Sequence, residues 1–180
     1  DGGYNSWYLD SPMDPVSQYR THVGKEVVQY IDENYRTIAQ RNSRAITGLS
    51  MGGHGALYLS LEFFNVFGAA GSMSGVVDLQ FTTKKYELGE KIGSFKKYPE
   101  RWEQYSVISN VYKFKDSKTH LIIDCGVDDA FIKSNRLLHT KLLGLNIPHD
   151  YSEKPGGHEW NYWVNSLEYH LMFFNSIFKK

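Results

Sequence analysis

The sequence contains a single cysteine, Cys125, among its 180 residues. One thiol cannot close a disulfide within the chain, which excludes a small fold held together by disulfides. Cys125 lies at the end of an apolar, strand-like run, and this position favours a small core residue over a reactive thiol. One cysteine does not identify the cellular compartment.

Excess charge of either sign is also absent. Twenty Lys and Arg residues balance twenty Asp and Glu residues. The balance gives no electrostatic reason to expect a nucleic acid or a membrane surface as partner. No apolar run is long enough to span a bilayer. A chain of 180 residues suits one globular domain with a real core, so we expect a single domain over residues 1–180.

Motifs for metal ions and phosphate-bearing cofactors are missing as well. Residues 48–55 are glycine-rich, but they have neither the ending of a phosphate-binding loop nor the spacing of a dinucleotide-binding loop. No pair of cysteines and no helix with two spaced histidines indicates zinc. We therefore expect a function that requires no metal and no organic cofactor.

The most informative feature present is a Gly-x-Ser-x-Gly elbow at residues 48–52. A short apolar strand is predicted before it, at residues 44–47, and a helix after it, at residues 53–61. A sharp strand-to-helix turn of this kind exposes the hydroxyl of Ser50, and it places the backbone N–H of Met51 at a helix N-terminus that can bind an oxyanion. A turn that only reverses the chain is the alternative, but the strand and the helix on either side favour a catalytic serine.

A serine nucleophile needs a base, and His158 is the best candidate of the seven histidines. It follows Gly156 and Gly157 in a loop, where an imidazole can be aimed at a partner. His54 is too close to Ser50 in sequence to reach back onto it easily. The remaining histidines lie in predicted helices or begin predicted strands; they are His22, His139, His170, His120 and His149.

The base needs a carboxylate that orients it, and Asp129 is the first candidate. It lies in the loop after a predicted strand at residues 121–125. Asp128 is the rival and Asp124 a more distant third, while capping of the next helix is the other role open to adjacent aspartates. The resulting order of serine, aspartate and histidine, each after a strand, is typical of α/β-hydrolases.

Strands and helices alternate along most of the chain. Apolar spacing predicts a long amphipathic helix over residues 15–41, with Asp14 as its N-cap and Pro15 in its first turn. Further strands are predicted at residues 45–47, 69–73, 121–125 and 148–153, and further helices at residues 131–144 and 160–178. Alternation of this kind implies a parallel sheet covered by helices.

One segment, residues 78–118, interrupts the alternation. It is charged and rich in aromatic residues, and it contains the lysine pairs at residues 84–85 and 96–97. We interpret it as an insertion or a cap of short helices over the site.

Five segments together resemble the Putative esterase (esterase D-like) family, which includes S-formylglutathione hydrolases, feruloyl and acetyl-xylan esterases and the antigen 85 mycolyltransferases. The segments comprise residues 1–10, 48–57, 67–75, 125–129 and 156–163. The resemblance implies an α/β-hydrolase fold and hydrolysis of carboxylic esters. It also implies that the family's catalytic aspartate corresponds to Asp129.

The resemblance also reveals a departure from the family pattern, because members carry further strands before the region that matches Asp1. One of those strands leads to the loop that supplies the second oxyanion-hole N–H. The resemblance therefore places the second oxyanion-hole donor before Asp1. We expect the strand before Ser50 to need a neighbour, supplied by upstream strands or by a second copy of the chain.

Three functions fit these features of the sequence. The first is a serine esterase that removes acetyl or feruloyl groups from carbohydrate, with Trp160, Trp7 and Tyr8 lining the substrate groove. The second is a thioesterase of the S-formylglutathione hydrolase kind, and the third is a catalytically silent binding protein. An intact triad argues against the third. The first function favours a secreted or periplasmic location over a cytoplasmic one.

Overall fold

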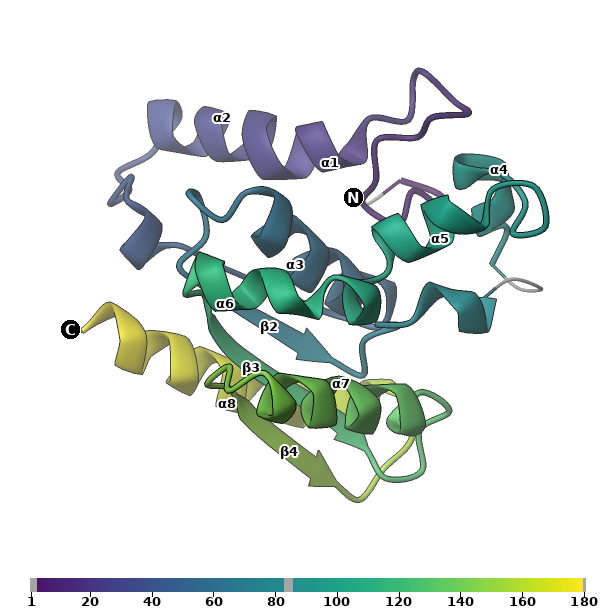
Figure 1. Ribbon diagram of the computed structural model, residues 1–180. Helices are drawn as coiled ribbons and strands as arrows, with labels where there is room; N and C mark the ends of the chain where they lie inside the picture. Colours follow the sequence, from purple (N-terminus) through teal and green to yellow (C-terminus); the bar gives the residue numbers. More distant parts are fainter. Residues whose placement is uncertain (1–2, 83–85, 180) are drawn as a thin grey trace.

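A four-stranded parallel sheet forms the centre of the molecule in the computed structural model, which describes residues 3–82 and 86–179 (Figure 1). Its order is β1-β2-β3-β4, so that each strand pairs with the next one in sequence. The strands are β1 (Ala45–Leu49), β2 (Ala69–Met73), β3 (His120–Gly126) and β4 (Asp150–Lys154). The predicted architecture of a parallel sheet flanked by helices is confirmed.

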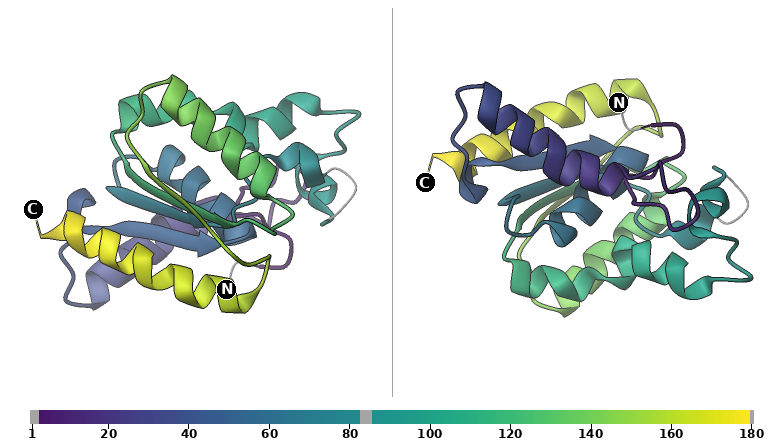
Figure 2. Two further views of the ribbon diagram at one scale, coloured as in Figure 1. Left: turned by 90° about the horizontal axis from the view of Figure 1, so that it is seen from below. Right: turned by 90° about the horizontal axis from the view of Figure 1, so that it is seen from above.

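Helices cover both faces of this sheet (Figure 2). One face carries α3 (Met51–Glu62) and α7 (Ile132–Gly144), and the other carries α8 (Trp160–Phe178). All three lie within two residues of the predicted ranges. Because the side chains of a strand alternate between faces, each strand contributes to both layers of packing.

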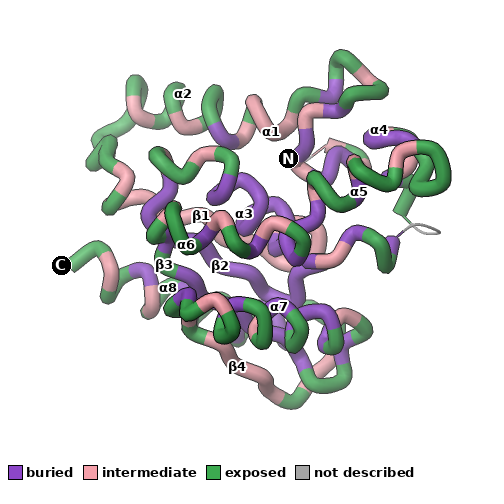
Figure 3. The backbone as a smooth tube through the Cα atoms, in the orientation of Figure 1, coloured by how far each residue is buried: buried purple, intermediate pink, exposed green. Residues whose placement is uncertain are grey.

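The main hydrophobic core lies between the sheet and the layer of α3 and α7 (Figure 3). Leu121 and Ile123 of β3 point into it and pack with residues of both helices. The intervening Ile122 instead packs with Phe174 of α8 in a smaller cluster on the opposite face. Strand β2 is buried along its whole length, as expected for a strand with neighbours on both sides and helices on both faces.

The predicted helix over residues 15–41 is wrong at both ends. The observed helix consists of α1 (Tyr19–Thr21), a π-helical turn η1 (His22–Glu26) and α2 (Val27–Asn34). Its N-cap is Gln18, which makes no capping hydrogen bond with its side chain, so the predicted cap at Asp14 is also wrong.

Local polar contacts explain why the helix starts late and ends early. The hydroxyl of Ser11 accepts the N–H groups of Met13 and Asp14, and this arrangement holds the chain in a turn. At the other end, Tyr35 adopts an extended conformation with φ −130° and ψ 159°. The apolar residues that suggested a longer helix are exposed beyond these points; Ile38, for example, is 68% exposed.

Short helices make up the described part of residues 78–118, as predicted. They are η3 (Leu79–Thr82), α4 (Leu88–Ile92), α5 (Pro99–Tyr105), η4 (Val107–Ser109), η5 (Val111–Lys113) and α6 (Phe114–Ser117). The lysine pair at residues 84–85 lies outside the described residues, as do residues 1–2 of the first matching segment. The segment is joined to the N-terminal loop by an ion pair between Lys91 and Asp14, 2.8 Å long. Its role as a cap stays a prediction.

Strand β1 lies at one edge of the sheet that the described residues form. All five of its residues are only half-buried, unlike those of β2. A short 3₁₀ turn, η2 (Arg41–Ser43), precedes it. The need of β1 for a further neighbour stays a prediction. Among residues 3–82 and 86–179, no helix combines the length and the apolar character that crossing a membrane requires.

Candidate active site

Ser50 lies on a sharp turn between β1 and α3, as the elbow motif predicts. Its backbone has φ 54° and ψ −116°, a strained conformation for a residue with a Cβ atom. A Cβ on Gly48 would lie 2.5 Å from the carbonyl oxygen of Gly52, so only glycine permits the turn to close. The strain therefore persists because the neighbouring residues are small and the turn is fixed by its hydrogen bonds. One of these runs from the Ser50 N–H to the Met73 carbonyl at 2.9 Å.

His158 lies in the loop between β4 and α8, with each ring nitrogen facing a partner. Its Nε2 is 2.8 Å from Oγ of Ser50, and its Nδ1 is 2.8 Å from Oδ2 of Asp129. A carboxylate only accepts hydrogen bonds, so Nδ1–H donates to Asp129 and Nε2 is free to accept the serine O–H. Edge-to-face contacts with Trp163 and Phe131 support the imidazole, with ring centroids 4.8 and 5.1 Å away.

Asp129 is the carboxylate that meets the histidine. Burial by itself would raise the pKa of Asp129, but hydrogen bonds from His158 and the Phe131 N–H hold it below its ordinary value. The Phe131 N–H lies 2.8 Å from Oδ1 of Asp129. The carboxylate therefore stays ionised beside the imidazole and can stabilise a positive charge on it.

The two rival aspartates lie elsewhere. Asp128 is exposed, and its backbone N–H donates to the carbonyl of Gly156. Asp124 is buried on β3 and bonds to His170 instead. Of the three candidates, the structure brings only Asp129 into contact with His158.

Met51 begins α3, immediately after Ser50. The first N–H groups of a helix have no partner within it, and they carry positive partial charge. The Met51 N–H is therefore suited to receive an oxyanion that forms at a carbonyl attacked by Ser50. The described residues do not assign a second donor.

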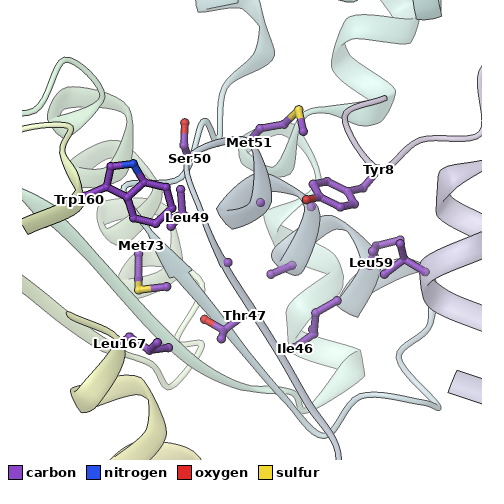
Figure 4. Close-up of a pocket in the computed structure, with 15 residues that line it drawn as sticks. Tyr8, Ile46, Thr47, Leu49, Ser50, Met51, Leu59, Met73, Trp160 and Leu167 are labelled. Carbon is purple, nitrogen blue, oxygen red and sulfur yellow. The ribbon is translucent and has the colours of Figure 1, made fainter. Parts of the chain in front are cut away.

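A groove of about 530 Å³ runs from Ser50 along the edge of β1 (Figure 4). Trp160 lies on one side of Ser50, and Met51 and Tyr8 lie on the other. Trp160 is 69% exposed, so its indole ring is available to a ligand. Trp7 differs from its prediction, because it is only 2% exposed and packs edge-to-face on His54 in the core.

Burial keeps two other ionisable side chains near the site, those of Cys125 and His54, in their uncharged forms. Burial raises the pKa of the Cys125 thiol to about 12, so it remains protonated and inert. Burial lowers the pKa of His54 to about 3, so its ring stays neutral. The described residues contain no group of three or more His, Cys, Asp and Glu side chains that could hold a metal ion.

Sequence reasoning missed two contributors to the site. Phe131 supports the His158 ring, and Leu167 lines the groove two helical turns after Trp160. The spacing of Trp160 and Leu167 places them on one face of α8, and this periodicity could have identified the second residue. Phe131 offered no comparable signal, because its contact with His158 depends on how two loops meet.

Together these groups can activate a hydroxyl and stabilise the charges that follow. An imidazole in contact with a serine hydroxyl can take its proton, and a buried carboxylate can stabilise the imidazolium. The helix N-terminus at Met51 supplies a positive partial charge where negative charge would develop. This combination suits acyl transfer.

Comparison with known proteins gives esterases among the similar sequences and solved structures. The chain is 26% identical to an acetyl esterase of Caldicellulosiruptor saccharolyticus, covering 89% of this chain and 65% of the relative. It is 29% identical to the S-formylglutathione hydrolase of Mus musculus, covering 73% of this chain and 46% of the relative. A solved structure of a ferulic acid esterase matches with a TM-score of 0.79 and 27% identity, over 95% of this chain and 64% of that chain.

The chain spans 40 to 65% of the length of the first curated relatives that it matches. The sequence profile of the Putative esterase family matches residues 2–174, which is nearly the whole chain. The matched range includes the elbow, the aspartate loop and the histidine loop described above. The chain belongs to the Putative esterase family, and its fold is that of the α/β-hydrolases.

Proposed function

We propose that the protein is a serine carboxylesterase that acts through an acyl-enzyme. The observation that carries the proposal is the continuous chain of hydrogen bonds from Ser50 through His158 to Asp129, with both links 2.8 Å long. Three side chains from distant parts of the sequence meet in the order that this chemistry requires. Membership of an esterase family supports the same activity.

The first step forms the acyl-enzyme. His158 Nε2 takes the proton of Ser50 as Oγ attacks the ester carbonyl, and Asp129 stabilises the imidazolium that results. The Met51 N–H binds the oxyanion of the tetrahedral intermediate. His158 then returns its proton to the leaving alcohol as the ester C–O bond breaks.

The second step releases the acid. His158 takes a proton from water, which attacks the acyl carbonyl of the Ser50 ester. The tetrahedral intermediate collapses, His158 returns the proton to Oγ of Ser50, and the carboxylic acid leaves. Since the same imidazole serves both steps, its position relative to Ser50 determines both rates.

For the substrate, we propose acetyl or feruloyl esters on carbohydrate. An exposed indole, Trp160, lies beside Ser50 at an open groove, and such a ring can stack on a sugar or a feruloyl group. The names of an acetyl esterase and a ferulic acid esterase among the similar proteins support this class. A glutathione thioester is the second candidate, supported by the similarity to the mouse S-formylglutathione hydrolase.

The test uses a fluorophosphonate probe together with a panel of esters. The probe should label the protein once, at Ser50, and Ser50→Ala should abolish both labelling and hydrolysis of p-nitrophenyl acetate. Ser60→Ala is the matched control, because Ser60 lies on the same helix and its hydroxyl donates to the Leu57 carbonyl of the helix backbone. Full activity in Ser50→Ala would disprove the mechanism, and faster turnover of thioesters than of feruloyl or acetyl esters would favour the second substrate class. A folded protein that neither labels nor hydrolyses any of these esters would refute the proposed activity and favour the silent binding protein.

A further inference from the structure

A second aspartate–histidine pair lies beneath the catalytic groups. Asp124 of β3 is 2% exposed and His170 of α8 is fully buried. Nε2 of His170 is 2.7 Å from Oδ2 of Asp124. The proposed acyl transfer gives this pair no role, although burying an ionisable pair has a cost in free energy.

The pair belongs to a network that reaches two further positions. Ser166, one helical turn before His170, donates its hydroxyl proton to the same carboxylate oxygen of Asp124. Nδ1 of His170 lies 2.8 Å from Oγ1 of Thr47 on β1. Because Nε2–H is used by Asp124, Nδ1 accepts the Thr47 O–H when the ring is neutral.

The sheet leaves room for the histidine at one residue of β2. A Cβ on Gly71 would lie 2.3 Å from Nδ1 of His170 and 2.6 Å from Oγ1 of Thr47. Glycine at this position leaves the space that the imidazole occupies between Thr47 of β1 and Asp124 of β3. The network therefore involves all three of these strands and α8.

Each of the three proposed catalytic residues lies just before or after a strand or helix that contributes a residue to this network. β1 ends directly before Ser50, β3 ends at Gly126 in front of the Asp129 loop, and α8 begins at Trp160 just after His158. The hydrogen bonds of Asp124 and His170 thus connect the three parts of the chain that must stay in register for proton transfer.

Three aromatic residues of α8, Tyr162, Trp163 and Phe174, supply its buried apolar contacts with the sheet. Only five residues of α8 are buried, and two of them, Ser166 and His170, belong to the network. Val164 and Leu171, on the outer side, are 61% and 57% exposed. Directional polar bonds fix one position of a helix where apolar contacts tolerate several.

We propose that Asp124, His170, Ser166 and Thr47 form a positioning network that fixes α8 on the sheet and so holds His158 against Ser50. Asp124, Ser166 and His170 lie outside the lining of the groove, and Thr47 lines it through β1. In this proposal all four act through His158. The proposal rests on the proposed function, in which Nε2 of His158 must take the serine proton. A misplacement of about 1 Å at such a group can cost on the order of a hundredfold in rate.

The decisive variant is Thr47→Val in the full chain, which removes the hydroxyl and preserves the shape of the side chain. We expect kcat for p-nitrophenyl acetate to fall about ten- to a hundredfold while KM stays within about twofold. Ser166→Ala and Asp124→Asn should act in the same direction. Thr47→Ser keeps the hydroxyl, so it should retain a kcat within about twofold of the wild-type value.

A matched control separates positioning from general stability. Leu142→Ala creates a cavity in the core under α7, away from α8, and should lower the melting temperature without lowering kcat below that temperature. The position of His158 is read independently from the downfield proton resonance of its Nδ1–H, assigned by its loss in His158→Gln. Thr47→Val should broaden this resonance, and Leu142→Ala should leave it sharp.

Unchanged kcat and an unchanged resonance in Thr47→Val would overturn the proposal, as would an equal loss of kcat in Leu142→Ala. If Asp124→Asn fails to fold, Thr47→Val and Ser166→Ala still decide the question. A wild-type protein that fluorophosphonate does not label would refute the proposed esterase activity, and the His158 resonance would still test the positioning network.

Discussion

The buried imidazole of His54 predicts a specific loss of stability in acid. Its ring is fully buried, stacked on Tyr58 and in edge-to-face contact with Trp7. Neither ring nitrogen has a hydrogen-bond partner among the described residues. Burial lowers the pKa of His54 from its ordinary 6.5 to about 3, because a charged ring in this place would be desolvated and unpaired.

The sign of the effect follows from proton linkage. Between pH 6.5 and about 3 the unfolded chain binds a proton at His54 and the folded protein does not. Stability is therefore fully present above pH 6.5 and is lost as pH falls through this window. One proton corresponds to about 1.4 kcal/mol per pH unit, so His54 alone should remove about 3 kcal/mol of unfolding free energy between pH 6.5 and 4.

The perturbation is His54→Phe, which retains an aromatic ring and removes the titration. The free energy of unfolding would be measured by urea titration with circular dichroism at pH 7, 6, 5 and 4. The free energy of unfolding of His54→Phe minus that of the wild-type protein should rise by about 3 kcal/mol between pH 7 and pH 4. Trp7→Phe is the control, because it loosens the same packing without removing the histidine, and it should lower stability equally at every pH. Equal pH slopes for the wild-type protein and His54→Phe would refute the reasoning.

Three further predictions concern the site and the sheet edge. Asp129→Asn should lower kcat by a factor on the order of 10³ to 10⁴ with little change in melting temperature, whereas Asp128→Asn, at an exposed position, should keep kcat within about threefold. The reverse ranking in steady-state kinetics would show that Asp128, and not Asp129, orients His158. Trp160→Ala should raise KM for feruloyl esters about tenfold and leave p-nitrophenyl acetate nearly unaffected, since only the larger substrate reaches the exposed indole. Residues 1–180 expressed alone should self-associate through the open edge of β1, as measured by analytical ultracentrifugation, and a soluble, cooperatively melting, active monomer would contradict this expectation.

The sheet and the elbow could be predicted from sequence because local signals define them. The first and last residues of β2 agree with the predicted strand at residues 69–73. The Gly-Ser-Gly spacing around Ser50 specifies a turn that few other residues could form. The helix over residues 15–41 was overextended because apolar spacing continued past the point where the chain turns. Exposed residues such as Ile38 satisfy the helical period without contributing to the core.

Contacts between distant residues could not be derived in the same way. Asp128 and Asp129 are adjacent, and the sequence ranked Asp129 first without excluding its neighbour. The loop contacts that turn Asp129 toward His158, among them the bond from the Asp128 N–H to Gly156, follow no local pattern. Trp7 was expected in the groove, but it is buried against His54. No local sequence pattern connects these two residues, so the burial of Trp7 could not be predicted. The bond between Thr47 and His170 spans 123 positions, and the sequence offers no sign that these two residues meet.

The order of the strands has a consequence for the way the protein is made. The strands lie side by side in the sheet in the order in which they occur in the sequence, β1-β2-β3-β4. Each strand that emerges from the ribosome can therefore pair with the edge of the strand before it. No pair of strands within this sheet has to separate to admit a later one. Ser50 is synthesised 108 positions ahead of His158, its proposed proton acceptor. If Ser50 is the nucleophile, as proposed, it has no base until the loop of His158 is made and α8 docks on the sheet. Labelling of Ser50 would then report that this part of the fold has formed.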